Sequence, residues 1–271
     1  MNRELWKKVK QFLLWWFLFL TPVFIGIFVW NIYGASVHLD SEAIKEQFFS
    51  NQGLSWAMVV GNMLIAIVFF GKRYVKLSFG RIERRMVWSA VGISILIAAA
   101  YMLVESSVFT LLDVNHLFSE ESEKMNEDNQ QLFSEIAGIL YGCIFAPIAE
   151  EIGFRGVLLD GLLKTRCRPW LAILISALAF GLLHYSVQFV GATVFGIIVG
   201  WLYWRTGSIL PGIIIHIVNN SLSFIDVSSQ SNTVLLVILV VCLLLLAYGL
   251  WWFGKKCIFA DEYNQTINTN K

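Results

Sequence analysis

Long apolar runs alternate with short polar segments along the whole chain. A helix needs about 20 apolar residues to cross the hydrocarbon core of a bilayer. We interpret as spans the runs at roughly 12–33, 54–71, 86–105, 134–153, 170–187, 190–204, 208–225 and 233–253. The pattern therefore predicts an all-α fold, a polytopic transmembrane helix bundle of about eight spans. No repeat or linker divides it, so residues 1–271 are expected to form a single integral membrane domain.

Composition and charge support this interpretation and orient the chain. Charged residues make up 14% of it, whereas a soluble domain carries about 25%. The predicted outer loops hold only Lys45 and Lys124, and most other basic residues fall in predicted inner segments. By the positive-inside rule, both termini are expected in the cytoplasm. The first apolar run is longer than that of a signal peptide, which predicts an uncleaved span.

Two further segments have predicted roles that are not catalytic. The longest polar segment, 113–128, is acidic and is expected to be a solvated outer loop, with a gating role as the alternative. Gly196 and Gly200 form a Gly-x-x-x-Gly pair, a spacing that lets helices approach closely. We expect this pair to draw the spans at 170–187 and 208–225 together. The net charge of +1 gives no indication of nucleic-acid binding.

Ionisable side chains at membrane depth are the strongest functional signal. Such groups cost several kcal/mol each in hydrocarbon unless they are paired or solvated. Glu151 and Arg155 are four residues apart and can pair along one helix face. Glu150 points about 100° away from Glu151 and has no local partner, which suits a general base. The alternative is a structural ion-pair knot formed by all three residues.

A proline lies one turn before these glutamates. Pro147 has no backbone N–H, so it removes a donor from the helix. At membrane depth the carbonyl freed in this way needs a protein or water partner. A water-accessible cavity beside Glu150 would provide one, and this interpretation is compatible with an ordinary proline kink.

Two later spans contribute histidines. His184 follows Phe180 by four residues, so the two rings are expected on one face of the span at 170–187. His216 is followed by Asn220 four residues later, with Asn219 as the alternative partner. A rise of about 1.5 Å per residue puts these groups and the glutamates at similar heights above the inner charges. A lone histidine in a span is more often packed than functional, but this coincidence predicts one shared internal site.

Glu-Glu-x-x-x-Arg, Phe-x-x-x-His and His-x-x-x-Asn, in this order, resemble the motifs of the CPBP family. This is the CAAX protease and bacteriocin-processing (Abi) family of intramembrane endopeptidases, here in a bacterial type. The resemblance covers about 134–225, which are expected to be the catalytic core spans. The matching positions are Glu150, Glu151, Arg155, Phe180, His184, His216 and Asn220.

The resemblance implies hydrolysis of a peptide bond by a glutamate-activated water. Glu150 would be the general base, and His184 would hold and polarise the water. His216 and Asn220 would stabilise the oxyanion, as preorganised donors do. Supporting positions would be Glu151, Arg155 and Phe180. The implied substrate is a membrane-associated peptide or protein, in peptide maturation or bacteriocin self-immunity at a bacterial plasma membrane.

Three alternatives remain open at this point. Glu150, His184 and His216 would also make a zinc-like ligand set, so a divalent metal is an alternative to a site that works by glutamate alone. A non-catalytic scaffold or regulator could retain the same site. A proton-coupled carrier could use the acidic and histidine residues as a relay.

Overall fold

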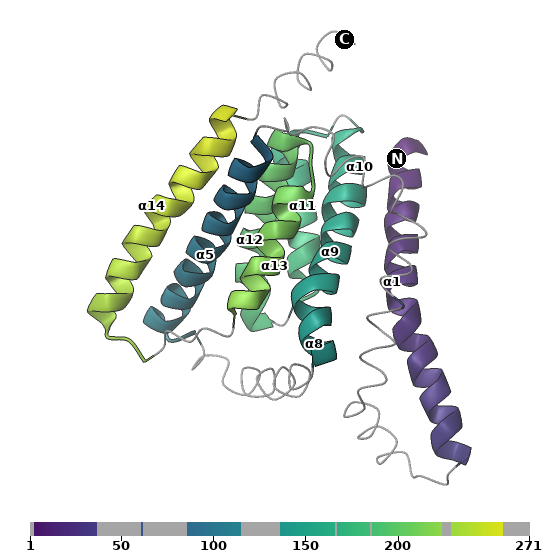
Figure 1. Ribbon diagram of the computed structural model, residues 1–271. Coiled ribbons are helices and arrows are strands. Elements are labelled where there is room, and N and C mark those ends of the chain that lie inside the picture. Colours follow the sequence, from purple (N-terminus) through teal and green to yellow (C-terminus); the bar gives the residue numbers. More distant parts are fainter. Residues whose placement is uncertain are drawn as a thin grey trace.

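The computed structural model describes residues 3–36, 61, 86–114, 136–165, 167–184, 186–223 and 229–256. Every regular element among these residues is a helix (Figure 1). In chain order the elements are α1 (Arg3–Ser36), α5 (Val87–Leu111), α8 (Ile136–Leu140), η3 (Tyr141–Phe145), α9 (Ala146–Glu151), η4 (Ile152–Leu159), α10 (Asp160–Leu163), α11 (Pro169–Gly181), α12 (Ser186–Thr206), α13 (Leu210–Leu222) and α14 (Asn232–Lys256). The segments η3 and η4 are π-helical.

The helices form one side-by-side bundle. The five elements from α8 to α10 follow one another without a break, and we call this stretch, 136–163, the site helix. In the bundle α14 lies along α5, α13 packs against α5 and α9, and α11 pairs with α12 (Figure 1). Helix α1 packs on the site helix through η4 and α10. The site helix is therefore enclosed by α1 on one side and by α11 and α13 on others.

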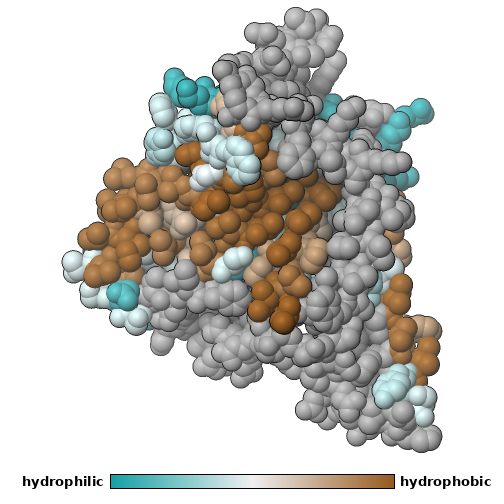
Figure 2. Space-filling model, in the orientation of Figure 1, coloured by the Kyte–Doolittle hydropathy of each residue, from teal (hydrophilic) through white to brown (hydrophobic). Residues whose placement is uncertain are grey.

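The outer surface is that of a membrane protein. Among the described residues, three helical stretches are long and apolar enough to cross a membrane: Val87–Leu111, Gln188–Thr206 and Asn232–Lys256. Figure 2 shows a broad apolar surface over α5 and α14, with polar residues at its ends. The predicted helical membrane bundle is confirmed. The count of eight spans and the side on which the termini lie stay predictions, since 54–71 (apart from residue 61) and 115–128 lie outside the described residues.

Two of the predicted spans are shorter than expected. Helix α11 ends at Gly181 instead of near 187, and α13 ends at Leu222. Each has 13 residues, a rise of about 20 Å, so each stops short of a full crossing. In contrast, the site helix continues past 153 to Leu163. The early end of α11 places His184 in a turn beyond the helix.

Local sequence explains the tight connection between α12 and α13. Gly207 has a φ of 60°, the left-handed conformation that commonly ends a helix and that favours glycine. Its N–H donates to the carbonyl of Tyr203 at 2.7 Å. The Ser208 hydroxyl then accepts the N–H of Leu210, the first residue of α13, at 3.2 Å. This short link returns the chain beside α12 and sets the position of His216.

The Gly-x-x-x-Gly pair packs closely, as predicted, but against α11 and the site helix instead of against α11 and α13. A Cβ added to Gly196 would lie 2.9 Å from the Cα of Ala177 on α11, and one added to Gly200 would lie 3.2 Å from Ile173. The carbonyl of Gly196 also accepts a hydrogen bond from Arg155 of the site helix. The absence of side chains at both positions therefore lets α12 approach α11 and the site helix closely.

Replacing Gly196 with alanine is expected to lower the free energy of unfolding by about 2 kcal/mol, because the new methyl group meets backbone that cannot move aside. Gly92→Ala is the matched control, since a Cβ there would meet nothing within 4 Å. That change is expected to be neutral or to add up to about 1 kcal/mol through helix propensity. Thermal unfolding of both variants in detergent checks the difference, and equal melting temperatures would contradict the packing argument.

Candidate active site

The site helix departs from α-helical geometry on both sides of the two glutamates. In η3 the N–H of Ala146 donates to the carbonyl of Tyr141, five residues back. At the end of η4 the N–H of Asp160 donates to the carbonyl of Arg155, again five residues back. Glu150 and Glu151 lie in the α-helical segment between them. Such π-helical segments are rare and are frequent at functional sites.

Glu151 is the centre of a fully buried ion pair. Its side chain is 0% exposed, and its Oε1 accepts the Nη1 of Arg155 at 2.8 Å. The same oxygen lies 3.2 Å from the Nδ1 of His216 on α13. The predicted pairing of Glu151 with Arg155 is confirmed. Gly212 of α13 leaves room for the second carboxylate oxygen, because a Cβ there would lie 2.7 Å from Oε2.

The Arg155 guanidinium is held by more than this carboxylate. Arg155 is 1% exposed, and its Nη2 donates to the carbonyl of Gly196 at 3.4 Å. The guanidinium carbon lies 4.8 Å from the centre of the Phe180 ring, a cation–π distance. Three helices therefore fix the charge that balances Glu151.

Glu150 faces the other side of His216. Its Oε2 lies 3.7 Å from the Nε2 of His216, and its side chain keeps 21% exposure. The sequence suggested that Glu150 has no partner on its own helix; the structure supplies one from α13. His216 therefore lies between two glutamates, with Nδ1 toward the buried Glu151 and Nε2 toward the accessible Glu150.

His184 reaches the same place from the turn after α11. Its Nδ1 is 2.9 Å from the carbonyl of Phe180. A carbonyl oxygen only accepts, so Nδ1 carries the hydrogen and Nε2 of the neutral ring presents a lone pair. The predicted proximity to Phe180 is confirmed, although His184 lies beyond the helix instead of on it.

The Phe180 ring links the three motifs. Its centre lies 4.6 Å from that of His184 and 5.6 Å from that of His216. Its side chain is 1% exposed, and Phe154 of η4 meets it edge to face at 5.2 Å. The predicted supporting residue is thus an aromatic spacer between Arg155 and both histidines.

Asn220 lies apart from these contacts. Its Nδ2 donates to the carbonyl of Gly142 in η3 at 2.9 Å. Pro147 was expected to free a carbonyl that needs a protein or water partner, and this amide is such a protein partner. The Oδ1 of Asn219, the alternative position, is buried with no hydrogen-bond partner among the described residues.

The zinc-like ligand set is not assembled in this geometry. Within the described ranges, no three His, Cys, Asp or Glu side chains lie close enough together to hold a metal ion. Nδ1 of His216 faces Glu151 and Nδ1 of His184 faces Phe180. Only the Nε2 atoms of the two histidines and the carboxylate of Glu150 remain as candidate ligands.

The sequence interpretation missed one acidic residue near the site. Glu105 is the single charged residue of α5, and its carboxylate occupies the space beside Gly191 of α12 where a Cβ would lie. On the preceding turn, the Tyr101 hydroxyl donates to the Gly191 carbonyl at 2.7 Å. The Tyr101 ring contacts Phe195, which in turn lies 4.9 Å from His216. The rule that singled out Glu150, an ionisable group inside a span, also applies to Glu105.

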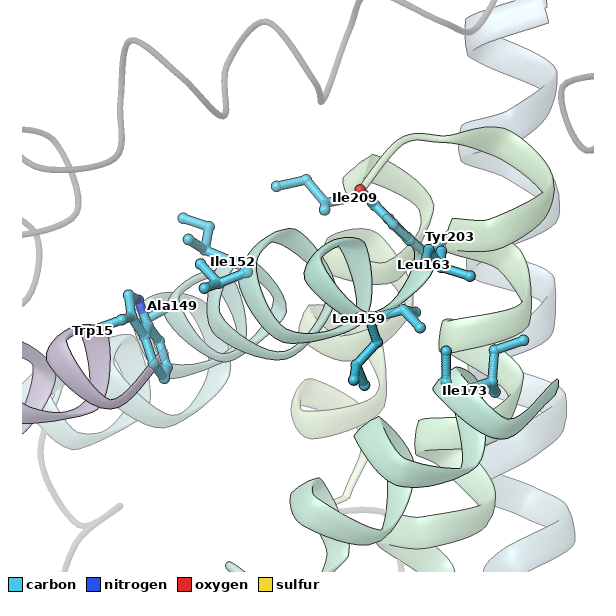
Figure 3. Close-up of a cluster of buried hydrophobic side chains, with 11 residues drawn as sticks. Trp15, Ala149, Ile152, Leu159, Leu163, Ile173, Tyr203 and Ile209 are labelled. Carbon is cyan, nitrogen blue, oxygen red and sulfur yellow. The ribbon is translucent and has the colours of Figure 1, made fainter. Parts of the chain in front are cut away.

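Helix α1 packs against the site helix. Trp15 is 2% exposed, and its ring fills the space left by Gly153 of η4. Figure 3 shows Trp15 against Ala149 and Ile152, next to the turn that carries the glutamates. The backbone of η4 is also held from α11, where the Ser176 hydroxyl donates to the carbonyl of Phe154 at 3.1 Å.

Fold and geometry together define a class: a helical membrane bundle with an internal acid–histidine site. Residues 132–222 match the family model described as type II CAAX prenyl endopeptidase Rce1-like. This match, over about a third of the chain, supports the CAAX protease family that the three motifs predicted. The match spans all seven predicted site residues. Comparisons with curated proteins and with solved structures gave no match.

Proposed function

We propose that this protein is an intramembrane endopeptidase that hydrolyses a peptide bond of a membrane-associated peptide or protein. The observation that supports the proposal most directly is the position of His216 between Glu150 and Glu151 inside an apolar bundle. An acid–histidine pair held in a site with little solvent suits proton transfer to and from a reacting water. The endopeptidase family of the segment 132–222 supplies the reaction class.

Glu150 is the general base in this proposal. Glu151 is bound to Arg155 and His216 and is fully buried, whereas Glu150 is partly exposed and turns only toward His216. The oxygen of a water attacks the scissile carbonyl carbon while one of its protons passes to Glu150. The free lone pair on Nε2 of His184 accepts a hydrogen bond from the same water and orients it.

The tetrahedral intermediate is stabilised from α13. Nε2 of His216, protonated from Glu150, donates to the oxyanion, and Glu151 on Nδ1 stabilises the imidazolium. The C–N bond then breaks, and the leaving amine takes the proton from His216 or Glu150. Asn220 is the second oxyanion donor in this proposal: one N–H of its amide donates to the Gly142 carbonyl, and the amide has a second N–H for the oxyanion.

The proposed setting is a bacterial plasma membrane that the chain crosses several times. Three helical stretches of membrane-spanning length and the apolar surface over α5 and α14 support a membrane location (Figure 2). Eight spans with both termini in the cytoplasm remain the proposed topology. Reporter fusions in the segments on either side of 54–71 would test it, and opposite labelling of the two sides is expected.

The activity can be tested on the purified full chain in detergent. We expect cleavage within a library of peptides that are made both with and without a lipid anchor, with a preference for the anchored form. In water labelled with heavy oxygen, mass spectrometry should find one labelled oxygen in each new carboxyl group, because water is the nucleophile. The negative control is Glu150→Gln, which removes the general base but keeps the shape of the side chain.

Repeating the assay with a chelator distinguishes a mechanism that depends on glutamate alone from one that depends on a bound metal. Cleavage that persists with chelator supports the glutamate-only water proposed here. Cleavage lost with chelator and restored by zinc would replace it with the metal-bound version. If the native chain and Glu150→Gln are equally inactive on every peptide, the endopeptidase proposal is wrong, and a non-catalytic scaffold becomes the better interpretation.

A further inference from the structure

One acidic side chain of α5 takes no part in the proposed mechanism. Glu105 is the single charged residue of this helix, and its side chain is partly exposed. Within the described ranges no Lys, Arg or His forms an ion pair with it, because the acids of the ion pairs there are Glu150, Glu151 and Asp160. An ionisable group at membrane depth is costly unless it is paired or solvated, and such groups mark functional sites.

The neighbours of Glu105 hold its carboxylate in place without balancing its charge. The carboxylate lies in the notch that Gly191 of α12 leaves, where a Cβ would otherwise be. The polar side chain beside it is Tyr101, whose hydroxyl has one hydrogen and donates it to the Gly191 carbonyl at 2.7 Å. Tyr101 and Met102, on the preceding turn, are each 4% exposed. A cation would be strongly attracted here, because opposite charges attract more strongly where the dielectric constant is low.

The Glu105 carboxylate is also within reach of a peptide bound at the candidate active site. The Tyr101 ring is 5.6 Å from that of Phe195, and the Phe195 ring is 4.9 Å from that of His216. Gly191 precedes Phe195 by one helical turn, a rise of about 6 Å. Glu105 is therefore on the order of 10 Å from His216. Because an extended peptide advances about 3.3 Å per residue, a substrate residue about two to four positions from the cleaved bond would meet the carboxylate.

Glu105 lies at the end of the bundle where His184 is found. It is in the last two turns of α5, and Gly191 is in the first two turns of α12. His184 is in the turn between α11 and α12. The unpaired acid and the proposed water-orienting histidine thus both flank the start of α12. A peptide that lies along His184 would pass close to Glu105.

We propose that Glu105 is a specificity residue: its carboxylate binds a cationic side chain, lysine or arginine, of the peptide that the site cleaves. The substrate supplies the charge that balances Glu105, so that binding and selection are the same event. The assignment rests on the proposed endopeptidase function and adds a substrate class to it, a membrane-associated peptide with a basic residue near its cleavage site. Glu105 does not touch the reacting atoms.

Paired peptides test this selection on the full chain in detergent. The two peptides of a pair differ only in having lysine or norleucine at one position, which is moved one residue at a time along both sides of the cleaved bond. At one position the native chain should cleave the lysine peptide with a kcat/KM about 10- to 100-fold above that of its norleucine partner, the effect expected of a hydrogen bond between charged groups. In Glu105→Gln this preference should disappear. If the ratio at every position is the same in the native chain and in Glu105→Gln, the proposal is wrong.

Two further variants show that the effect belongs to the charge of Glu105. Ser106→Ala is the matched control, since Ser106 is the next residue of α5 and its hydroxyl bonds within the helix to the sulfur of Met102. It is expected to keep the native ratio. Glu105→Lys reverses the charge, so it should prefer a peptide with glutamate at the selected position over one with lysine. A retained preference for lysine would contradict the assignment, and if Glu105→Lys does not fold, Glu105→Gln decides alone.

Failure of this assignment can be told apart from failure of the proposed function. If peptides are cleaved without any dependence on Glu105, only the specificity residue is wrong. If no peptide is cleaved, the endopeptidase proposal fails, and binding then decides the role of Glu105. The lysine peptides should raise the melting temperature of the native chain more than their norleucine partners do, and this difference should be absent in Glu105→Gln. Equal shifts for both kinds of peptide on the native chain would overturn the cation-binding role.

Discussion

Glu150→Gln is expected to lower kcat for peptide hydrolysis by about 1,000-fold, the size of effect that general-base catalysis supplies, with little change in stability. The amide has the shape of the carboxylate but cannot accept the proton of the attacking water. Glu150 is outside the buried ion pair and keeps 21% exposure, so the fold does not depend on its charge. Initial rates on a cleaved peptide and thermal unfolding of the same preparation check both parts.

Asp160→Asn is the control for this change. Asp160 is an acid on the same site helix, hydrogen-bonded to Lys164 at 2.5 Å and to the Tyr203 hydroxyl at 3.1 Å, and it is part of none of the three motifs. Its conversion to an amide is expected to leave kcat within about two-fold of native, since the site geometry is untouched. Retention of more than a tenth of the native kcat in Glu150→Gln would remove Glu150 from the role of base.

Arg155→Met is expected to have the largest effect on stability, a loss of about 3–5 kcal/mol in the free energy of unfolding. The change leaves the 0% exposed carboxylate of Glu151 without its cation inside an apolar bundle. It also removes the contact of the guanidinium with the Phe180 ring and its bond to Gly196. Chemical unfolding in mixed micelles, followed by tryptophan fluorescence, measures the loss.

Two comparisons isolate the charge from the packing. Adding Glu151→Gln to Arg155→Met removes the stranded charge, so the double variant should be more stable than Arg155→Met alone. Lys164→Met breaks the Lys164–Asp160 pair, which has the same spacing on the same helix but a 54% exposed lysine. That change is expected to cost less than 1 kcal/mol. Similar losses for Arg155→Met and Lys164→Met would refute the buried-charge argument.

The sequence predicts those parts of the structure that depend on spacing within one helix. The pairing of Glu151 with Arg155 follows from their separation of four residues, and the close approach of α12 to α11 follows from Gly196 and Gly200. Phe180 and His184 are neighbours for the same reason. Apolar run length likewise predicts a helix at each of the seven runs that the structure describes.

The remaining features depend on contacts between helices, which spacing cannot reveal. A sequence pattern cannot show that His216 turns one nitrogen to each glutamate, since this depends on the rotation of α13. The early end of α11 was missed because its apolar composition continues past Gly181. Pro147 signals a freed carbonyl, but the spacing cannot show its donor, because Asn220 lies more than 70 positions away in the sequence.

Trp15 has a consequence for protein engineering. Its ring occupies the notch at Gly153, and Phe12 and Trp16 surround the fully buried Phe154 within 6 Å. All three aromatic residues come from α1, far upstream of the segment 132–222. We therefore do not expect that segment to fold on its own, because a fragment cut at its ends would expose its aromatic interior. A smaller version of this protein must retain the first helix, joined covalently or added back as a separate peptide.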